Sequence, residues 1–521
     1  MKNHTSTKGT VMQSAHASQM IRIHPQDSVG IARTPIAAGT SLNDGIVALQ
    51  DIPAGHKIAL RDIAPGTELR RYGQIIGFAS ESIAAGAHVH TQNLTIGDFA
   101  KDYAICSERK ESGPRAPDRF FNGILRPDGR VATRNYVGIL TTVNCSAHVA
   151  SLVARAFEPN PLTGEDPLAD FPNVDGVVAL AHKTGCGMSA GEPLQLLRRT
   201  LAGYARHPNF SHVIVIGLGC EVNQVGNLIE EQRLAGRLEG MTIQGAGGTR
   251  RAVQAGIEFV RSVLGKSNEI KRQPVPISEI SVALICGGSD SYSGLTANPA
   301  LGAACDLLIA HGGTAILSET PETYGAEHLL TRRARSPEVA ERLLERIRWW
   351  EEYAARNQVS LNANPTPGNK AGGLTTILEK SLGALAKGGT TDLTQVVEYA
   401  EQVTEKGLVF MDGPGYDPVQ VTGQIASGAN LVAFTTGRGS VFGAKPVPSI
   451  KLATNSPMFR HMEEDMDINC GTIIDGTETL ADCGVRIFEK MIEIAGGRAT
   501  KSEEMGFGAH EFAPWPIGAV I

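Results

Sequence analysis

The sequence is poor in the residues and runs that mark several large classes of protein. Aromatic residues make up 5% of its 521 residues, and its 8 Cys are too few and too spread out for a disulfide framework. It has no continuous apolar run of the length, about 18 residues, that a membrane-spanning helix needs. Asp and Glu (54) outnumber Lys and Arg (48), so the net charge of −6 provides no positive field for a nucleic acid. We therefore expect no nucleic-acid or membrane partner and a cytoplasmic location.

Glycine is the residue that the sequence has in excess. It contributes 59 of the 521 residues, about 11%, against roughly 7% in an average protein. Glycine permits tight turns and close backbone approaches, which are typical of α/β enzymes. With 42% hydrophobic residues the chain has ample material for buried cores, and its length predicts two to four domains.

The N-terminal part predicts a small all-β domain over residues 20–97. Phrases of the form Ile-x-x-Gly occur four times there, and each predicts a short strand followed by a glycine turn. Residues 1–19 are polar and patternless, so we expect a disordered tail, with Met20 as a possible natural start. Residues 98–117 are charged and then rich in Gly and Pro, which predicts a linker.

The rest of the chain predicts two α/β domains, over residues 118–270 and 271–521. Short, continuously apolar segments rich in Val and Ile, such as YVGILTTVNC and ISVALICGGSD, alternate there with helical patterns. Buried strands that alternate with helices indicate parallel sheets. The expected fold class is therefore α/β, with a small all-β domain in front.

Four cysteines share one sequence context, the polar turn directly after an apolar strand. In parallel α/β sheets the carboxyl ends of the strands form the crevice where ligands bind, so four thiols there can converge on one site. The alternative is that each is a small buried hydrophobic residue. No C-x-x-C motif indicates a zinc ribbon or a thioredoxin-like site. The four cysteines are Cys145, Cys186, Cys220 and Cys286.

Polar side chains in the same turns are candidates for acid–base catalysis and for substrate binding. His182 and Glu221 accompany two of the cysteines and are candidate catalytic groups. In glycine-rich turns, hydroxyl and amide groups can bind substrate oxygens, and Lys or Arg can clamp a carboxylate. A solvated surface charge is the alternative for each cation. The candidates for substrate binding are Ser289, Asp290, Asn298, Asn369, Lys370, Thr435, Thr436, Arg438 and Lys451.

The all-β domain contributes three histidines and a lysine in two short motifs. His56 and Lys57 are adjacent, and His88 and His90 stand two residues apart. Residues two apart on a strand face the same side, so His88 and His90 can share a metal ion. Lys57 is our candidate general base, because a desolvated lysine can reach a useful pKa. Surface histidines without a ligand are the alternative.

These motifs together resemble the altronate/galactarate dehydratase family. The resemblance extends from Met20 to the C-terminus and implies an N-terminal SAF-type β-clip domain followed by two catalytic α/β domains. The pair His88 and His90 resembles the altronate-specific members, whereas the galactarate-specific ones depart from it. The motifs that carry the resemblance are GHKIALRDI, RYGQIIG, HVHTQN, HKTGCG, GLGCEVNQV, CGGSDSYSGLTANP, SETPETYGAEHLL, NPTPGNKAGG and FTTGRG.

The resemblance implies a hydro-lyase that removes water from a small sugar acid with ferrous iron, Mn²⁺ being a possible substitute. D-Altronate would give 2-dehydro-3-deoxy-D-gluconate; galactarate, another aldarate or sulfolactate are the alternative substrates. We expect the four cysteines to meet at one iron site, closed by His88 and His90, or to hold an iron–sulfur cluster. A sugar-acid-binding module is the non-enzymatic alternative. G-x-G-x-x-G and Walker A sequences are absent, which disfavours a dinucleotide enzyme, and we expect a homodimer.

Overall fold

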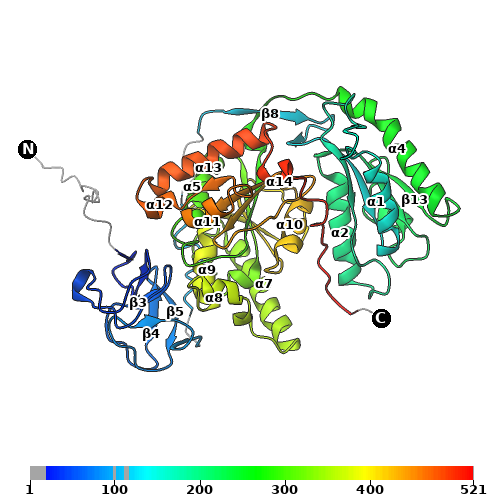
Figure 1. Ribbon diagram of the computed structural model, residues 1–521. Coiled ribbons are helices and arrows are strands. Elements are labelled where there is room, and N and C mark those ends of the chain that lie inside the picture. The colour runs from blue at the N-terminus through cyan, green and yellow to red at the C-terminus, as the bar shows by residue number, and fades with distance from the viewer. Residues whose placement is uncertain (1–18, 98–100, 111–115, 520–521) are drawn as a thin grey trace, which may run out of the picture. The chain divides into compact units, whose positions relative to one another are not determined.

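The computed structural model describes residues 19–97, 101–110 and 116–519, which form two compact units, residues 1–97 and 98–521 (Figure 1). The expected tail, except for residue 19, and parts of the expected linker lie outside the described residues. Within the described ranges, every helix is too short or too polar to cross a membrane.

The first unit consists of two small antiparallel sheets. One has the strand order β1-β2-β3-β6, made from Met20–Ile21, Val29–Ala32, Lys57–Ala59 and His88–Val89. The other has the order β4-β5-β7, made from Glu68–Arg71, Gln74–Ala79 and Leu94–Thr95. A single 3₁₀ turn, η1 (Asn43–Gly45), is the helical element among the described residues of this unit.

The four Ile-x-x-Gly phrases form the internal repeat of this unit. Their isoleucines are buried and pair across the unit as two isolated bridges, Ile36 with Ile52 and Ile63 with Ile83. Each glycine that follows has a φ between +75° and +82°, in the left-handed region that glycine adopts without strain. The repeat thus supplies four anchoring side chains and four tight turns.

The first sheet of the second unit has four parallel strands in the order β11-β10-β12-β13. These strands are Gly176–Leu180, Tyr136–Thr141, Phe210–Gly217 and Glu239–Thr242. Side chains alternate along β10, so that Val137 and Ile139 pack against α1 and α4, whereas Tyr136 and Leu140 pack on the α2 side. Figure 1 shows this layering of helices on both faces. The helices are α1 (Ala147–Arg155), α2 (Glu192–Arg206), α3 (Val225–Glu231) and α4 (Thr249–Glu269).

The second sheet is larger, with seven parallel strands in the order β17-β18-β16-β15-β19-β20-β21. Its strands are β15 (Ser281–Cys286), β16 (Thr314–Leu317), β17 (Leu393–Val397), β18 (Gly407–Met411), β19 (Leu431–Thr436), β20 (Ser449–Ala453) and β21 (Ile468–Asn469). Its longer helices are α5 (Ala297–Ala310), α7 (Pro337–Arg356), α9 (Ile377–Leu385), α10 (Asp417–Ala426) and α13 (Leu480–Ala495). The shorter helices are α6 (His328–Thr331), α8 (Pro367–Ala371), α11 (Ser456–His461), α12 (Thr472–Asp475) and α14 (Lys501–Glu504). The described residues of the second unit also form five 3₁₀ turns. One follows β10 of the smaller sheet, η2 (Asn144–Ser146), and the others are η3 (Ile277–Glu279), η4 (Thr320–Glu322), η5 (Leu361–Ala363) and η6 (Ala386–Gly388).

One hydrophobic core joins the two parallel sheets. It runs from α2 on the smaller sheet to α10 on the larger one, and Gly203 lies where the two helices approach most closely. A Cβ atom at Gly203 would stand 2.3 Å from the carbonyl oxygen of Ala426, so glycine is required there. A three-stranded antiparallel sheet, β14-β8-β9 (Gln273–Pro276, Phe120–Leu125 and Val131–Ala132), adds to the same unit. The predicted fold class, a small all-β domain followed by α/β domains, is confirmed.

Candidate functional site

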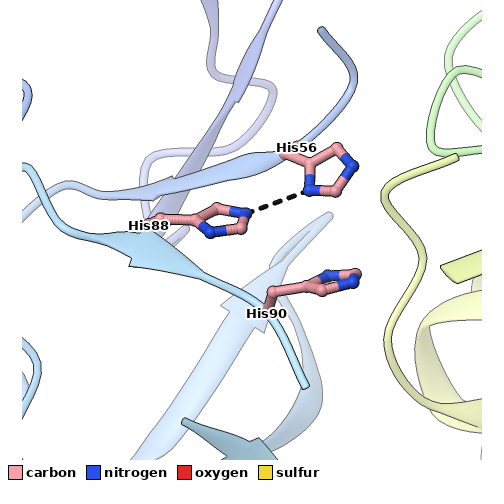
Figure 2. A group of neighbouring side chains, drawn as sticks. All are labelled: His56, His88 and His90. Carbon is pink, nitrogen blue, oxygen red and sulfur yellow. Dashed lines mark hydrogen bonds between the residues drawn. The ribbon is translucent and has the colours of Figure 1, made fainter. Parts of the chain in front are cut away.

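Three imidazoles gather at one place in the first unit (Figure 2). His88 is opposite Ile58 in the pairing of β3 with β6, and His90 follows two residues later, so both face the side that His56 also reaches. The His56 Nδ1 and His88 Nε2 atoms are 3.0 Å apart, and one ring nitrogen from each of the three histidines lies within 4.8 Å of the others. The structure thus adds a third histidine, His56, to the predicted pair of His88 and His90.

The imidazole of His88 is held in its neutral form. Burial, together with the nearby His56 and Lys57, lowers the pKa of His88 to about 4. A neutral imidazole keeps a nitrogen lone pair that can bind a metal ion. Three nitrogen donors are a suitable set for a divalent transition metal and leave further coordination positions for substrate oxygens. The triad therefore fits ferrous iron.

Lys57 lies beside this triad in sequence but not on its face. It is fully buried, and it adjoins Ile58, the residue that pairs with His88. Successive strand residues point to opposite faces, so the Lys57 side chain belongs to the other side of the sheet. Its charge acts on His88, but its position does not support our interpretation of Lys57 as the base.

A second cluster lies at the carboxyl edge of the seven-stranded sheet. Cys286 ends β15, and Glu319 and Glu322 follow β16. The Lys387 ammonium donates to Cys286 Sγ at 2.8 Å and to Glu319 Oε2 at 3.0 Å, and all three residues are fully or almost fully buried. Lys380 forms a second ion pair at 2.7 Å with Glu322. We call these five residues the buried ionic cluster.

Carboxyl groups of this edge hold protons near neutral pH. Burial raises the pKa of Glu319 to about 8 in spite of Lys387, and burial together with Glu322 raises the pKa of Asp417, at the start of α10, to about 7. The ammonium groups of Lys380 and Lys387 lie among three carboxyl groups. One of these carboxyls can therefore stay protonated while the remaining charges balance. Groups with such pKa values can exchange protons at physiological pH.

The backbone at Glu319 is also unusual. Glu319 has a φ of +71°, a left-handed conformation that is uncommon for a residue with a side chain and costs about 1–3 kcal/mol. Its Oε1 atom is buried and makes no hydrogen bond with any described residue. Strain and an unsatisfied carboxylate oxygen together make Glu319 a candidate functional residue.

The structure places Cys286 in a different sheet from the other three cysteines, and its role as a metal ligand stays a prediction. Burial raises the pKa of its thiol to about 12, its sulfur accepts a hydrogen bond from Lys387, and its sulfur lies within 4.8 Å of carboxylate oxygens of Glu319 and Glu322. Cys145, Cys186 and Cys220 are exposed, whereas Cys286 is buried. The four strand ends belong to two different sheets, which the shared sequence context did not reveal.

The loop after β15 uses its predicted substrate-binding groups to hold the protein together. The buried Asp290 carboxylate accepts hydrogen bonds from Ser293, Thr454 and Asn455. Asp290 thus fixes this loop, and its role in substrate binding stays a prediction.

The amide and hydroxyl groups of this region are occupied in the same way. Asn298 donates to the Gly383 carbonyl and accepts from Thr435 Oγ1 at 2.7 Å. Asn369 donates to the carbonyl oxygen of Ser289 at 2.8 Å and caps helix α8 through Thr366. These bonds fix the loops, and the roles of Asn298, Thr435 and Asn369 in substrate binding stay predictions.

The remaining predicted clamps differ in exposure. Lys451 is buried and donates to the Phe442 carbonyl at 3.2 Å, and Thr436 Oγ1 accepts from the Gly439 amide, so both are engaged within the fold. Arg438 is exposed and Lys370 is half-buried, so both can reach a ligand. Their role as carboxylate clamps stays a prediction.

In the smaller sheet, both predicted catalytic groups hold turns in place. Glu221 accepts from Thr142 Oγ1 at 2.6 Å and from the amides of Leu218 and Gly219, and these bonds outweigh burial, so that the pKa of Glu221 is lowered. His182 Nε2 lies 2.8 Å from the Thr141 carbonyl oxygen, to which it donates. Both side chains thus hold turns in place, and their catalytic roles stay predictions.

Sequence reasoning did not select several residues that the structure brings forward. Lys380 and Lys387 follow no motif and are recognised by their burial alone. Glu319 and Glu322 stand in SETPE, directly after an apolar strand, where the rule applied to the cysteines could have found them. His56 was noted beside Lys57 but not selected as a ligand.

The fold and these clusters define an α/β enzyme with a separate small β domain. The family models agree along the chain: residues 18–97 match the altronate/galactarate dehydratase SAF domain, residues 123–268 the second domain of D-galactarate dehydratase/altronate hydrolase, and residues 277–520 the C-terminal domain of D-galactarate/altronate dehydratase.

Relatives of known activity agree with these matches. The chain is 36% identical to galactarate dehydratase (L-threo-forming) of Escherichia coli K12, over 97% of this chain and 99% of the relative. It is 35% identical to altronate dehydratase of the same organism, over 96% and 100%, and 34% identical to (2R)-sulfolactate sulfo-lyase subunit beta of Chromohalobacter salexigens, over 74% and 95%. The chain belongs to the galactarate/altronate dehydratase family and is a hydro-lyase.

Acid sensitivity of the fold follows from His182. Burial lowers its pKa to about 4 from 6.5, so the unfolded chain binds the proton first, and the stabilisation present above pH 6.5 is lost as the pH falls towards 4. The loss is on the order of 3 kcal/mol. We expect His182→Gln to flatten the decline of the thermal unfolding midpoint over this range, whereas His148→Gln, at an exposed histidine, leaves it unchanged. An unaltered decline in His182→Gln would contradict this assignment.

Proposed function

We propose that this hydro-lyase acts on D-altronate and forms 2-dehydro-3-deoxy-D-gluconate. The observation that carries the proposal is the triad of His56, His88 and His90, in which the paired histidines of the HVH motif are joined by a third. The relatives act on galactarate or altronate by their names, at nearly equal identity, so the choice of altronate rests on this motif.

We propose that the triad holds ferrous iron. Its donors are imidazole nitrogens, one of them with a pKa of about 4, so a metal ion meets little competition from protons. When bound, the ion supplies Lewis-acid stabilisation of the negative charge that develops on a hydroxy acid, typically several kcal/mol. Mn²⁺ has the same charge and binds oxygen and nitrogen ligands, so it is a reasonable substitute.

The reaction also needs groups that accept and donate protons. A proton leaves the carbon next to the carboxylate, the hydroxyl on the following carbon departs as water after it gains a proton, and the enol rearranges to the ketone. We assign this proton handling to Glu319 and Asp417, which have pKa values of about 8 and about 7. Lys387 keeps Glu319 in place through its ion pair.

Galactarate is the alternative substrate, because its dehydratase is as similar to this chain as the altronate enzyme is. Sulfolactate is supported by a relative that matches 74% of the chain. A cytoplasmic location and a homodimer stay predictions from the sequence.

The choice of substrate is tested by a panel of acids. With anaerobic enzyme and ferrous iron, we expect D-altronate to yield a 2-keto acid at least about tenfold more efficiently than galactarate, a difference of ~1.4 kcal/mol in transition-state stabilisation. Keto-acid formation is measured for D-altronate, galactarate and sulfolactate. Preference for galactarate would support the alternative, and turnover of none of the acids would exclude the proposal.

The iron site is tested by removing one imidazole. We expect His88→Ala to bind ferrous iron at least tenfold more weakly than the wild type and to lose most turnover, since one of three protein ligands is gone. His24→Ala removes a half-buried histidine of the same unit that is not in the triad, and it should retain both. Iron is measured by titration followed by metal analysis. Equal iron binding by His88→Ala and the wild type would rule out this site.

The proton-handling assignment is tested at Glu319. Gln has nearly the same shape but cannot exchange a proton, so we expect Glu319→Gln to lower kcat by about 10²–10⁴-fold and to remove an apparent pKa near 8 from the pH–rate profile. Glu489→Gln, in the exposed ion pair with Arg119, should leave kcat and the profile unchanged. Circular dichroism checks the fold of both variants. A Glu319→Gln enzyme that is folded and keeps wild-type turnover would refute the role.

A further inference from the structure

Three exposed cysteines lie at the carboxyl edge of the smaller parallel sheet. Cys145 is in the 3₁₀ turn after β10, Cys186 is in the turn after β11, and Cys220 directly follows β12. The strand β10 lies between β11 and β12 and is parallel to both, so the three turns are neighbours at one edge of the sheet. Free cysteine is among the most buried residue types, and Cys305, Cys470 and Cys483 follow that rule here.

Hydrogen bonds join the three turns to one another. The Asn144 amide donates to the Thr184 carbonyl at 3.1 Å, which connects the turns that carry Cys145 and Cys186. The Asn223 amide donates to the Gly185 carbonyl at 3.1 Å, which connects the Cys186 turn to the Cys220 turn. The Asn223 side chain donates to the Thr142 carbonyl, also at 3.1 Å, and closes the ring of contacts.

Buried polar side chains also hold these three turns in place through hydrogen bonds. Glu221, next to Cys220, accepts from Thr142 at 2.6 Å, and His182 donates to the Thr141 carbonyl. Gly185, next to Cys186, has a φ of +102°, and a Cβ atom there would stand 2.1 Å from the Thr142 carbonyl oxygen. Glu221, His182 and Gly185 thus all help to hold together the three turns that carry the cysteines.

We propose that Cys145, Cys186 and Cys220 bind an iron–sulfur cluster. Three thiols on a rigid edge, open to solvent and separate from any core, form a soft donor set that suits iron–sulfur clusters, zinc or copper(I). On binding, each thiol loses its proton and becomes a thiolate ligand. Three protein thiolates leave one iron of a four-iron cluster free to take an oxygen ligand from solution.

The three sulfur atoms do not lie close enough together in the structure to surround a single ion. Metal–thiolate bonds are about 2.3 Å long, so the sulfurs around one ion are separated by at most about 4.6 Å. Among the residues that the structure describes, two groups of possible ligands have their atoms within 4.8 Å of one another, and the three thiols are not such a group. A cluster of several irons separates its thiolates more widely than a single ion does, so a cluster is the group of the two that we propose.

The test measures acid-labile sulfide, which a mononuclear iron site does not contain. The full-length protein is reconstituted anaerobically with ferrous and ferric iron and sulfide and is then desalted. We expect about four sulfides and at least about four irons per wild-type chain, with a broad absorption band near 400 nm that iron–sulfur proteins show. We expect Cys145→Ala, Cys186→Ala and Cys220→Ala each to lose most of the sulfide and the band.

Two controls separate this site from the others. Cys106→Ala should keep the full sulfide content, and so should His88→Ala, although the latter loses the iron of the histidine triad. Sulfide retained by the triple variant of Cys145, Cys186 and Cys220, or one zinc or iron bound there by the wild type without sulfide, would overturn the cluster. Either result leaves the proposed dehydration intact, because that reaction is measured by keto-acid formation and by iron binding in His88→Ala.

Discussion

The larger sheet depends on the balance of charge among side chains that are buried from solvent at its carboxyl edge. Lys387 and Glu319 are fully buried and 3.0 Å apart, and Lys380 and Glu322 form a second pair beside them. Removing one partner from such a pair leaves an uncompensated buried charge, which costs several kcal/mol. The strand ends, the turn at Glu319 and the position of η6, which carries Lys387, therefore have to be maintained together.

A buried ion pair is weak evidence for stability, since its desolvation can exceed its attraction. Glu319 adds a left-handed backbone and a carboxylate oxygen that no described residue bonds. By contrast, the buried side chains of Asp290, Asn298 and Asn369 all make hydrogen bonds that fix their loops. Backbone strain and a buried carboxylate oxygen without a hydrogen bond thus coincide at Glu319, which is the pattern of a prearranged reactive group.

Periodicity and glycine turns were sufficient to predict the architecture. The four Ile-x-x-Gly phrases became buried anchors with left-handed glycines, and apolar segments such as ISVALIC became parallel strands. The position of a side chain relative to its own strand was harder to predict. Lys57 was grouped with the histidines because it is near them in sequence, yet alternation along β3 turns it to the other face.

The cysteines show where sequence context reaches its limit. Cys286 ends its strand and the other three cysteines lie in the turns that follow theirs, so the rule placed each of them correctly at the carboxyl end of a parallel sheet. The rule contains no information about which sheet a strand joins, and strand order is decided by contacts between residues far apart in the chain. Cys286 belongs to the larger sheet, where it is buried and the Lys387 ammonium donates to its sulfur, whereas the other three cysteines share an edge of the smaller sheet and are exposed. The same local sequence therefore yields a protonated thiol within an ionic cluster in one sheet and three accessible thiols in the other, and the difference is set by topology rather than by the residues beside each cysteine.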